Sequence, residues 1–341
     1  MGITIKDIAK QCGVGVSTVS RALNDHPDIN RETKEKIMKI VEENDFVPNN
    51  SARNLKRIDS KSVAVLVKEI ENPFFATMMK TMETRIREKG YDFYIQHVGK
   101  EQDEIEAAME QIADKKIRGI IFLGGEFKSR EEKLSKIKIP FVSCTVRIPD
   151  DVKGYGTYVA IDDRKESCKI VDYLCRKGRK NIVILASDIK DNNIGKARLD
   201  GYRDALKAHK MKENPEQICY LKGKDVAYSM ENGYKSTKKL IKDHVKFDAV
   251  FGISDLMIIG AAKALIEEGI RIPDEVMLAG FDGLEYTRFF EPSITTMKQP
   301  VEEIAIESVE SLFTMIENGK KVSGKILPAQ LVKRRSTEGV L

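Results

Sequence analysis

From residue 63 onward the chain alternates short apolar stretches with longer amphipathic ones, and this alternation constrains the fold more than any other feature. The apolar stretches have the length of β-strands and lie at residues 63–67, 91–95, 119–123, 140–144, 181–185, 248–253 and 276–281. Stretches with helical periodicity lie between them, at residues 75–89, 103–115, 163–177, 196–209, 226–242 and 255–268. Strands that alternate with helices form parallel sheets covered by helices on both faces. The sequence therefore predicts an α/β fold of doubly wound parallel sheets.

The predicted strands are too many for one comfortable sheet, and the strand–helix pattern restarts near residue 161. We therefore expect two similar α/β lobes with a cleft between them. A chain of 341 residues is long enough for this core and a further small domain. Hydrophobic residues at 41% and charged residues at 33% are typical of a globular protein.

The N-terminal segment has a different texture and is predicted to form three short helices. Thr4 and Asp7 are spaced as a capping pair for the first helix. A second helix is expected from Val16 to Leu23 and a third from Arg31 to about Asn44. The polar stretch that follows Pro48 is the best linker in the sequence.

The stretch GVGVSTVSRALN, residues 13–24, allows two interpretations at first sight. As a dinucleotide-binding loop it fails, because no strand precedes it and Thr18 occupies the third glycine position. Two short helices joined by a glycine-containing turn are instead typical of a helix-turn-helix motif. A small helical bundle with a polar outer face has the same periodicity, so periodicity alone leaves both structures open.

The N-terminal stretch is one of several motifs that occur in a particular order along the chain. These motifs are TIKDIAKQCGVGVSTVSRALN, NDFVPNNSARNLK, ENPFF, the GYRDAL stretch that follows Arg198, IPDEVMLAGFD, PSITTMKQP and LVKRRST. Together they resemble the lactose-repressor-type (LacI/GalR) family of bacterial transcriptional regulators over nearly the whole chain. The resemblance implies a sequence-specific DNA-binding regulator of transcription, acting as a repressor, with a core like that of periplasmic binding proteins.

The resemblance also implies the domain boundaries. A helix-turn-helix DNA-binding headpiece is expected at residues 1–47, a hinge helix and linker at 48–61, and a two-lobed effector-binding and dimerisation core at 62–341. Lobe one would comprise about residues 62–160 and 291–322, and lobe two about residues 161–290 and 323–338.

Six positions carry over the family's DNA contacts, and these are Val16, Ser17, Arg21, Ala52, Leu55 and Lys56. The first three would read bases in the major groove, where Arg can donate two hydrogen bonds to guanine and Val can touch a thymine methyl group. The last three match minor-groove positions of the hinge, with Leu55 as a wedge between base pairs. Without the resemblance, Leu55 would be one exposed apolar residue in a linker. Gly15 stands where the family usually has Ser, and Gly is a tolerated N-cap.

A small effector is expected at the carboxyl ends of the core strands, where doubly wound sheets bind ligands. The predicted effector-binding residues are Phe74, Phe75, Arg198, Tyr228, Ser254 and Asp282. A guanidinium that donates and a carboxylate that accepts could share the hydroxyls of a sugar, and aromatic rings could stack on its apolar face. Alternatively, Arg198 pairs with a nearby acid, and Phe74 or Phe75 belongs to the hydrophobic core.

The identity of the effector stays open, because two positions depart from the family pattern. Ser254 replaces a frequent Asn, and Ile194 stands where small hydroxyl residues often occur. A sugar or sugar derivative is the first expectation, and a nucleobase effector or a protein co-regulator, as in catabolite-control relatives, is the alternative. The sequence does not separate an inducer from a co-repressor.

Enzyme and membrane functions have little support in the sequence. The four histidines show no ligand spacing, and CxxC, HExxH and GxSxG motifs do not occur, so we expect no enzyme, metal or cofactor. No apolar run reaches the ~18 residues that span a bilayer. The N-terminus lacks a signal-peptide stretch, which argues for a cytoplasmic location and against an extracytoplasmic sugar-binding protein.

The expected assembly is a homodimer on a near-palindromic operator. One three-helix headpiece offers few base contacts, so two-fold symmetry is needed for useful specificity. Only EGVL follows Thr337, which leaves no room for a C-terminal heptad helix and favours dimers over tetramers.

Overall fold

The chain divides into two compact units, residues Met1–Ser60 and Lys61–Leu341. A computed structural model describes residues 3–23, 28–44, 46, 61–68, 70–99, 101–115, 117–127, 130–149, 152, 154–191, 193–221 and 228–339. Each unit has its own hydrophobic core, and the two are described separately below.

Three helices form the N-terminal unit, namely α1 (Ile5–Cys12), α2 (Val16–Leu23) and α3 (Arg31–Glu43). Thr4 and Asp7 cap α1 reciprocally, because each backbone N–H is accepted by the other's side chain, at 2.9 and 3.4 Å. Gly13 ends α1 with a left-handed φ of 70°, a conformation that glycine adopts without steric cost. The three helices bury a small apolar core of Ile8, Ala9, Cys12, Val19, Ala22 and Ile37.

The first lobe of the larger unit is a six-stranded sheet in the order β11-β5-β4-β3-β1-β2. Its strands are β1 (Ser62–Lys68), β2 (Asp92–Val98), β3 (Gly119–Leu123), β4 (Phe141–Cys144), β5 (Gly156–Ala160) and β11 (Lys325–Ile326). Its helices are α5 (Pro73–Glu88), α6 (Glu104–Lys115), α7 (Glu131–Leu134) and α13 (Val301–Asn318). Side chains of β1 alternate between the two faces: Val63, Val65 and Val67 pack under α5 and α13, whereas Ala64 and Leu66 pack under α6. Both faces of the strand are buried, which explains its continuous apolar sequence.

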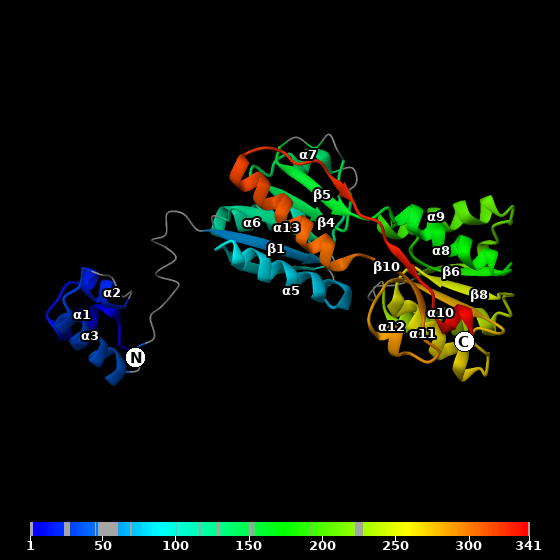
Figure 1. Cartoon of the computed structure of the whole chain (residues 1–341), viewed down its shortest axis with the longest axis horizontal. Helices are drawn as coiled ribbons and strands as arrows, with labels where there is room; N and C mark the ends of the chain where they lie inside the picture. The colour runs from blue at the N-terminus through cyan, green and yellow to red at the C-terminus, as the bar shows by residue number, and fades with distance from the viewer. Residues whose placement is uncertain are drawn as a thin grey trace. The chain divides into compact units, whose positions relative to one another are not determined.

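The second lobe has the equivalent strand order β12-β10-β9-β8-β6-β7, but its edge strand β12 runs antiparallel to β10, whereas β11 runs parallel to β5. Its strands are β6 (Ile182–Asp188), β7 (Ile218–Leu221), β8 (Ala249–Gly252), β9 (Met277–Asp282), β10 (Thr295–Lys298) and β12 (Gln330–Val332). Its helices are α8 (Asp163–Arg176), α9 (Ile194–Ala208), a 3-10 turn η1 (Pro215–Gln217), α10 (Met230–Lys242), α11 (Asp255–Glu267), α12 (Tyr286–Phe289) and α14 (Arg335–Glu338). Figure 1 shows α8 and α9 on one face of this sheet and α10 and α11 on the other.

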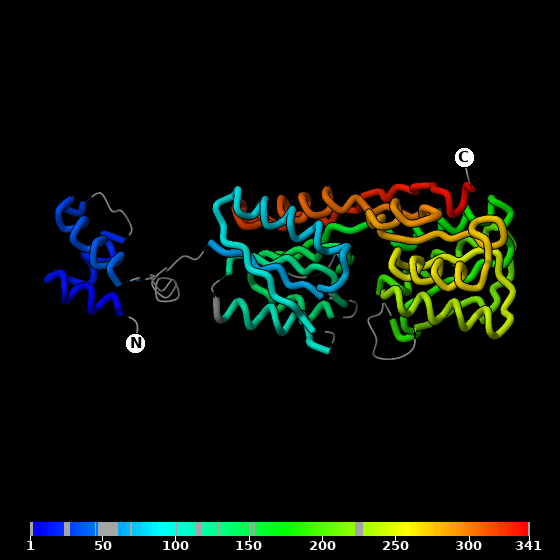
Figure 2. The backbone as a smooth tube through the Cα atoms, turned by 90° about the horizontal axis from the view of Figure 1, so that it is seen from below, coloured from blue at the N-terminus to red at the C-terminus, as the bar shows by residue number. Residues whose placement is uncertain are grey.

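The chain crosses between the lobes three times: after β5, between β10 and α13, and between β11 and β12. Figure 2 shows α13 running back along the first lobe beside α5. The second and third crossings lie later than predicted. Residues 291–298 belong with the second lobe, because β10 pairs with β9, and β11 belongs with the first, because it pairs with β5. Short returning strands of two to four residues carry too little periodicity to be assigned to a sheet from sequence.

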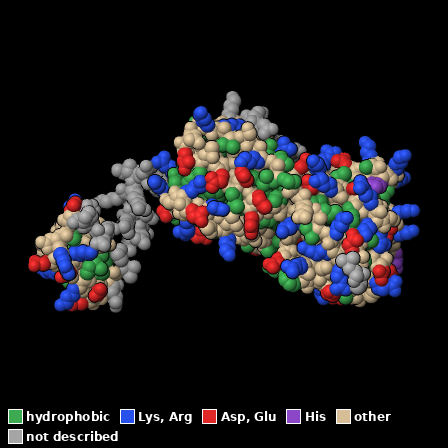
Figure 3. Space-filling model, in the orientation of Figure 1, with side chains coloured by type: hydrophobic (Ala, Val, Ile, Leu, Met, Phe, Trp, Pro, Cys, Tyr) green, Lys and Arg blue, Asp and Glu red, His purple; other side chains and the backbone are tan. Residues whose placement is uncertain are grey.

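Charged side chains cover the surface of the larger unit. On the face in Figure 3, Lys and Arg side chains are interspersed with Asp and Glu over both lobes. Many of them form exposed ion pairs, such as Arg164 with Asp204, and such pairs contribute little to stability. Of the helices in the described residues, none has the length and apolar character needed to cross a membrane.

Candidate functional site

The outer face of α2 carries three of the predicted DNA-reading side chains. Val16, which is 42% exposed, lies there with exposed Ser17 and Arg21, while Val19 and Ala22 are buried on the opposite face. The carbonyl of Gly15 accepts hydrogen bonds from the N–H groups of Thr18 and Val19, at 2.9 and 3.2 Å, and so begins the helix without a side-chain cap. The helix thus presents two polar side chains and one small apolar side chain that are free to meet a partner. The predicted hinge residues Ala52, Leu55 and Lys56 lie outside the described residues.

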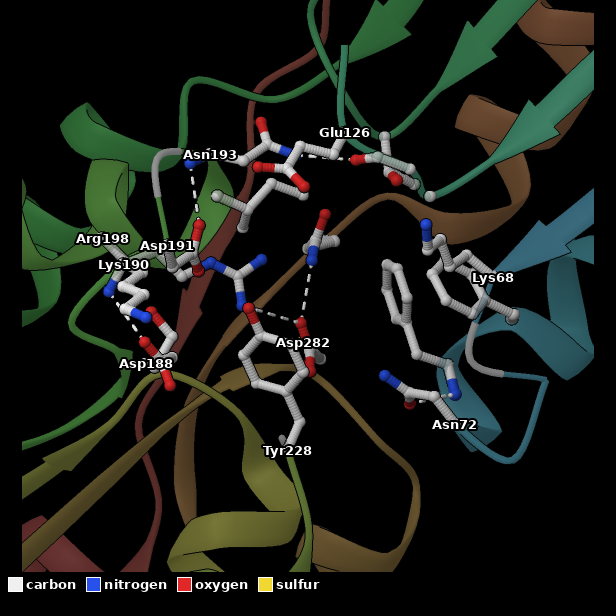
Figure 4. A pocket seen from close by; sticks show the side chains of 18 of the residues that line it. Lys68, Asn72, Glu126, Asp188, Lys190, Asp191, Asn193, Arg198, Tyr228 and Asp282 are labelled. Atoms are coloured by element: carbon white, nitrogen blue, oxygen red, sulfur yellow. Dashed lines mark hydrogen bonds and ion pairs between the residues drawn. The ribbon is translucent and has the colours of Figure 1, made fainter. Parts of the chain in front are cut away.

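A cavity of about 450 Å³ opens between the two lobes of the larger unit. Its walls are segments that follow the carboxyl ends of β1, β3 and β4 in the first lobe and of β6, β9 and β10 in the second. Figure 4 shows Arg198, Asp282 and Tyr228 on one side of the cavity and Lys68 and Asn72 on the other. Parallel strands bring their carboxyl ends to one edge of a sheet, so two such edges facing each other form a binding crevice.

Arg198 of α9 is the centre of the second-lobe wall and is 5% exposed. Its Nε donates to Asp163 Oδ1 at 2.8 Å, and one terminal nitrogen lies 3.4 Å from Asp282 Oδ1. The same nitrogen donates to the carbonyl of Ile253 at 2.5 Å, and the guanidinium lies 3.8 Å from the centroid of the Phe281 ring. A buried charge persists only when it is paired and hydrogen-bonded, and Arg198 meets both conditions.

Asp282 ends β9 with a φ of 111°, which is uncommon for a residue other than glycine. Gln299 Nε2 donates to its Oδ1 at 2.9 Å, and the Gln299 N–H donates to its carbonyl oxygen at 3.1 Å. Burial raises the pKa of Asp282 to about 6, although Arg198 opposes this rise. The Asp282 carboxylate therefore keeps its acceptor character near neutral pH.

The turn after Asp282 is braced from behind by Asp255, the first residue of α11. Asp255 accepts hydrogen bonds at 2.7 Å from the N–H groups of Gly283 and Leu284 and from the Thr296 hydroxyl. Burial, and then the negative charge of Asp282, raise the pKa of Asp255 to about 8. Asp255 positions the wall of the cavity without lining it.

Aromatic rings from both lobes add an apolar surface to the cavity. Phe74 and Phe75 lie in the first turn of α5, whose N-cap Asn72 accepts from the Phe74 N–H at 3.0 Å. The two rings are 5.5 Å apart and tilted by 59°, and Tyr228 lies in the second-lobe wall. Both phenylalanines also belong to the hydrophobic core, so each ring packs in the core and lines the cavity at the same time.

A second buried charge supports the first-lobe wall. Glu104, which is 2% exposed, pairs with Lys68 at 2.9 Å and accepts from the N–H of Glu126 at 2.5 Å. Glu126 follows Gly125, whose φ of 118° and close contact with Phe127 leave no room for a side chain. The carbonyl of Gly125 accepts from Asn193 Nδ2 at 2.7 Å, and this hydrogen bond joins the two lobes across the cavity.

Thr145, directly after β4, is the most unusual residue of the first-lobe wall. It adopts a φ of 75°, and a β-branched residue in this region costs about 1–3 kcal/mol. The side chain is 4% exposed, lines the cavity, and its hydroxyl has no hydrogen-bond partner among the described residues. Buried hydroxyls are normally satisfied, so this one requires an explanation.

The cavity brings together five of the six predicted effector-binding residues: Phe74, Phe75, Arg198, Tyr228 and Asp282. Ser254 is not among the residues that line it. Ser254 is instead the buried N-cap of α11, and its hydroxyl makes no hydrogen bond to a described residue. The expected pairing of Arg198 with a nearby acid is also present, and it involves two acids at once.

Several residues of the site were not predicted from the sequence, and these are Asp163, Thr145, Asn193 and Gln299. Asp163 follows β5 and Gln299 follows β10, two strands that the apolar pattern did not identify. The rule that ligands gather at strand carboxyl ends would have found both residues once those strands were known. Thr145 directly follows the predicted strand at 140–144, so the same rule could have found it. Asn193 carries no local signal, because its role depends on a contact with the other lobe. Among the described residues, no group of three or more His, Cys, Asp or Glu side chains is arranged to hold a metal ion.

Comparison with known families and proteins agrees with this architecture. Residues 4–49 match the model of bacterial regulatory proteins of the lacI family, and residues 171–337 match the periplasmic binding protein-like domain. The HTH-type transcriptional regulator MalR of Clostridium butyricum is 37% identical over 337 residues, which cover 98% of this chain and 99% of that protein.

Two solved structures have the same fold over nearly their full length. The transcriptional regulator CelR in complex with cellobiose is 25% identical, with a TM-score of 0.70 and coverage of 98% of this chain and 99% of that chain. The Lac repressor dimer bound to operator and the anti-inducer ONPF is 20% identical, with a TM-score of 0.73 and coverage of 99% of both chains. The helix-turn-helix unit, the two-lobed core and the relative with 37% identity lead to one conclusion: this chain belongs to the lacI family of bacterial regulatory proteins and is a DNA-binding transcriptional regulator.

Proposed function

We propose that this chain is a repressor whose affinity for its operator is controlled by a carbohydrate bound between the two lobes of the core. The observation that carries this proposal is the meeting of Arg198, Asp282 and three aromatic rings in one cavity. A guanidinium that donates and a carboxylate that accepts match the hydroxyls of a sugar, and the rings match its apolar face. The cavity volume is within the ~300–1,000 Å³ typical of small-molecule sites.

The DNA-binding part of the proposal rests on α2. Its exposed face would enter the major groove, with Arg21 donating to a guanine and Val16 against a thymine methyl group. In the hinge, Ala52, Leu55 and Lys56 would enter the minor groove, with Leu55 between two base pairs. Binding of this kind by a single unit is weak, so the operator should be a near-palindrome read by two copies.

A homodimer is proposed for the same reason, and the surface of the core is compatible with it. Helix α12 exposes two large apolar side chains, Tyr286 at 56% and Phe289 at 73%. Exposed apolar side chains that lie together are typical of protein–protein contact surfaces. The related Lac repressor was solved as a dimer on its operator.

Control by the effector requires that it bind one arrangement of the lobes better than another. Arg198 and Asp282 would hold the ligand on the second lobe, while Phe74 and Phe75 would contact it from the first. A ligand that contacts both walls stabilises one separation of the lobes, and the dimeric core would transmit this to the paired DNA-binding units. The CelR complex with cellobiose supports a saccharide as the class of ligand.

The test uses the full-length chain and an operator obtained by in vitro selection from random duplexes. Maltose, cellobiose, ribose, guanine and hypoxanthine are screened by thermal shift, and each hit is added to an operator-binding assay. We expect a saccharide to stabilise the core and to change operator affinity by about 5- to 150-fold, the usual range of allosteric coupling. A response to a nucleobase alone would favour the nucleobase alternative. No response to any small molecule, with operator affinity altered by an added cellular protein, would favour the protein co-regulator.

A further inference from the structure

Among the described residues, carboxylates outnumber cations in the lining of the cavity. Four carboxylates in its lining are Glu101, Glu126, Asp188 and Asp191, two from each lobe. None of the four forms an ion pair with another residue that the structure describes, and three of them are exposed. Asp188 and Asp191 accept hydrogen bonds from backbone N–H groups of their own loop, at 2.8 and 2.7 Å, which fixes their position.

The cations of the lining do not offset these carboxylates. Lys68 is held by Glu104 at 2.9 Å, and Arg198 is held by Asp163 and Asp282. Lys190, the remaining cation of the lining, is exposed on the loop that carries Asp188 and Asp191. Among the described residues, a ligand therefore meets four carboxylates and one cation without an ion pair, Lys190, while the other two cations of the lining, Lys68 and Arg198, are paired. A phosphate or carboxylate group on the ligand would be repelled.

A separate observation indicates which neutral group the ligand carries. Thr145 lines the first-lobe wall, and its buried hydroxyl has no hydrogen-bond partner among the described residues. The Thr145 N–H donates a hydrogen bond to the carbonyl of Val159 at 2.8 Å. This bond fixes the backbone and limits how far the hydroxyl can move toward a hydrogen-bond partner. A hydroxyl can both donate and accept, and a ligand hydroxyl is its natural complement.

We infer that the effector is an uncharged polyhydroxy molecule, that one of its hydroxyls bonds to Thr145 Oγ1, and that the four carboxylates of the lining exclude phosphorylated forms of the same molecule. This inference rests on the proposed carbohydrate control and specifies which form of the carbohydrate acts. A regulator of this kind responds to a sugar before any kinase or phosphotransfer step has acted on it.

The first test compares maltose, cellobiose and ribose with their monophosphate esters, by calorimetry on the full-length chain at low and at high salt. The neutral sugar that binds is expected to bind at least tenfold more tightly than its phosphate ester. Salt should narrow this difference, because ionic screening weakens repulsion by exposed charges. A phosphate ester that binds as tightly as its parent would overturn the inference and leave the proposed function intact. If neither form of any sugar binds, both the inference and the proposed function are overturned.

Charge-removing variants locate the source of the exclusion. Glu101→Gln/Glu126→Gln should bring the affinity for the phosphate ester at least threefold closer to that of its parent sugar. The matched control is Glu110→Gln/Glu317→Gln, which removes the same charge from exposed sites on α6 and α13 that do not line the cavity. An equal effect of the two double variants would overturn the role of the lining carboxylates.

The second test concerns Thr145. Thr145→Val keeps the shape and β-branching and removes the hydroxyl, so it should weaken binding of the neutral sugar about tenfold and leave the unliganded protein as stable as before or more stable. Thr145→Ser, which retains a hydroxyl, should bind almost normally. Thr157→Val is the control, because Thr157 is equally buried with an unpartnered hydroxyl but does not line the cavity. Unchanged sugar affinity in Thr145→Val would overturn the contact.

Discussion

The two lobes have the same strand order and contribute different chemistry to the cavity between them. In each lobe the first strand lies between the second and the third, and a strand from the C-terminal segment adds to the far edge. The equivalence extends to single residues: Thr145 follows β4, Asp282 ends β9, and both have a positive φ. At this equivalent position the first lobe carries a hydroxyl without a partner and the second a carboxylate held by Arg198 and Gln299.

This difference shows how one backbone arrangement supports two kinds of wall. In the second lobe the polar groups bind one another before any ligand is present, so the wall is preorganised and its residues also stabilise the fold. In the first lobe the two phenylalanine rings and Thr145 line the cavity without side-chain hydrogen bonds of this kind. Substitutions in the second-lobe wall should therefore affect stability and binding together, and substitutions in the first-lobe wall should affect stability less.

The largest effect is expected for Arg198→Ala. The substitution leaves the carboxylates of Asp163 and Asp282 buried without their cation, which typically costs about 3–5 kcal/mol of unfolding free energy. Chemical denaturation would measure this loss, and the ligand response should disappear with it. Arg203→Ala is the control, because Arg203 lies on the same helix in a partly exposed pair with Glu213 and should cost only about 0–1 kcal/mol. A loss no larger than that of the control would contradict the preorganised second-lobe wall.

The next effect concerns Asp255, which supports the same wall from behind. Its pKa rises from 3.8 to about 8 on folding, so the folded protein binds more protons than the unfolded chain between these values. Stability from this group is therefore full at low pH and falls as the pH rises toward 8. Urea denaturation between pH 6 and 8 should show this fall in the wild-type protein and a smaller one in Asp255→Asn, because the asparagine does not titrate. If the unfolding free energy of the two proteins fell equally with pH, the fall could not be assigned to the titration of Asp255.

A smaller effect is expected for Glu104→Gln in the first lobe. Glutamine keeps an acceptor for the Glu126 N–H but loses the negative charge that pairs with Lys68. Lys68 is partly exposed, so water can solvate its ammonium group when the ion pair is lost. The expected cost is about 1–3 kcal/mol of unfolding free energy, below that of Arg198→Ala. Denaturation of the two variants under the same conditions makes the comparison. A loss of unfolding free energy larger than that of Arg198→Ala would contradict the expectation that the second-lobe wall contributes more to stability than the first-lobe wall.

The smallest effect is expected for Asn193→Ala, which removes the hydrogen bond from the second lobe to the Gly125 carbonyl of the first. One such bond contributes about 0.5–1.5 kcal/mol, and water at the cavity mouth can replace part of it. Asn214→Ala offers a control, because Asn214 caps η1 away from the cavity. Amide exchange near Gly125 should rise in Asn193→Ala alone. If amide exchange near Gly125 rose equally in Asn214→Ala, the rise could not be assigned to loss of the hydrogen bond between the lobes.

Regular elements with strong periodicity were predicted closely from the sequence. The helices predicted at 163–177 and 255–268 occur as Asp163–Arg176 and Asp255–Glu267. The strands β5, β7 and β10 were not among those predicted. They are four or five residues long, and β10, with the sequence TTMK, has neither an apolar run nor a clear alternation. β5 (GTYVA) and β7 (ICYL) do contain residues that favour strands, but runs this short become strands only by pairing with neighbouring strands.

The sequence by itself determined the helix-turn-helix motif, the α/β alternation, the family and five of the residues that line the cavity, because each of these is carried by local spacing or by an ordered set of motifs. Only the tertiary structure decided what those residues touch. Arg198 meets Asp163 across 35 positions and Asp282 across 84, Ser254 is held behind the cavity, and Thr145 is left without a partner in its wall. Burial and pairing depend on which distant segments pack together, and the pattern of residues along one segment does not contain that information.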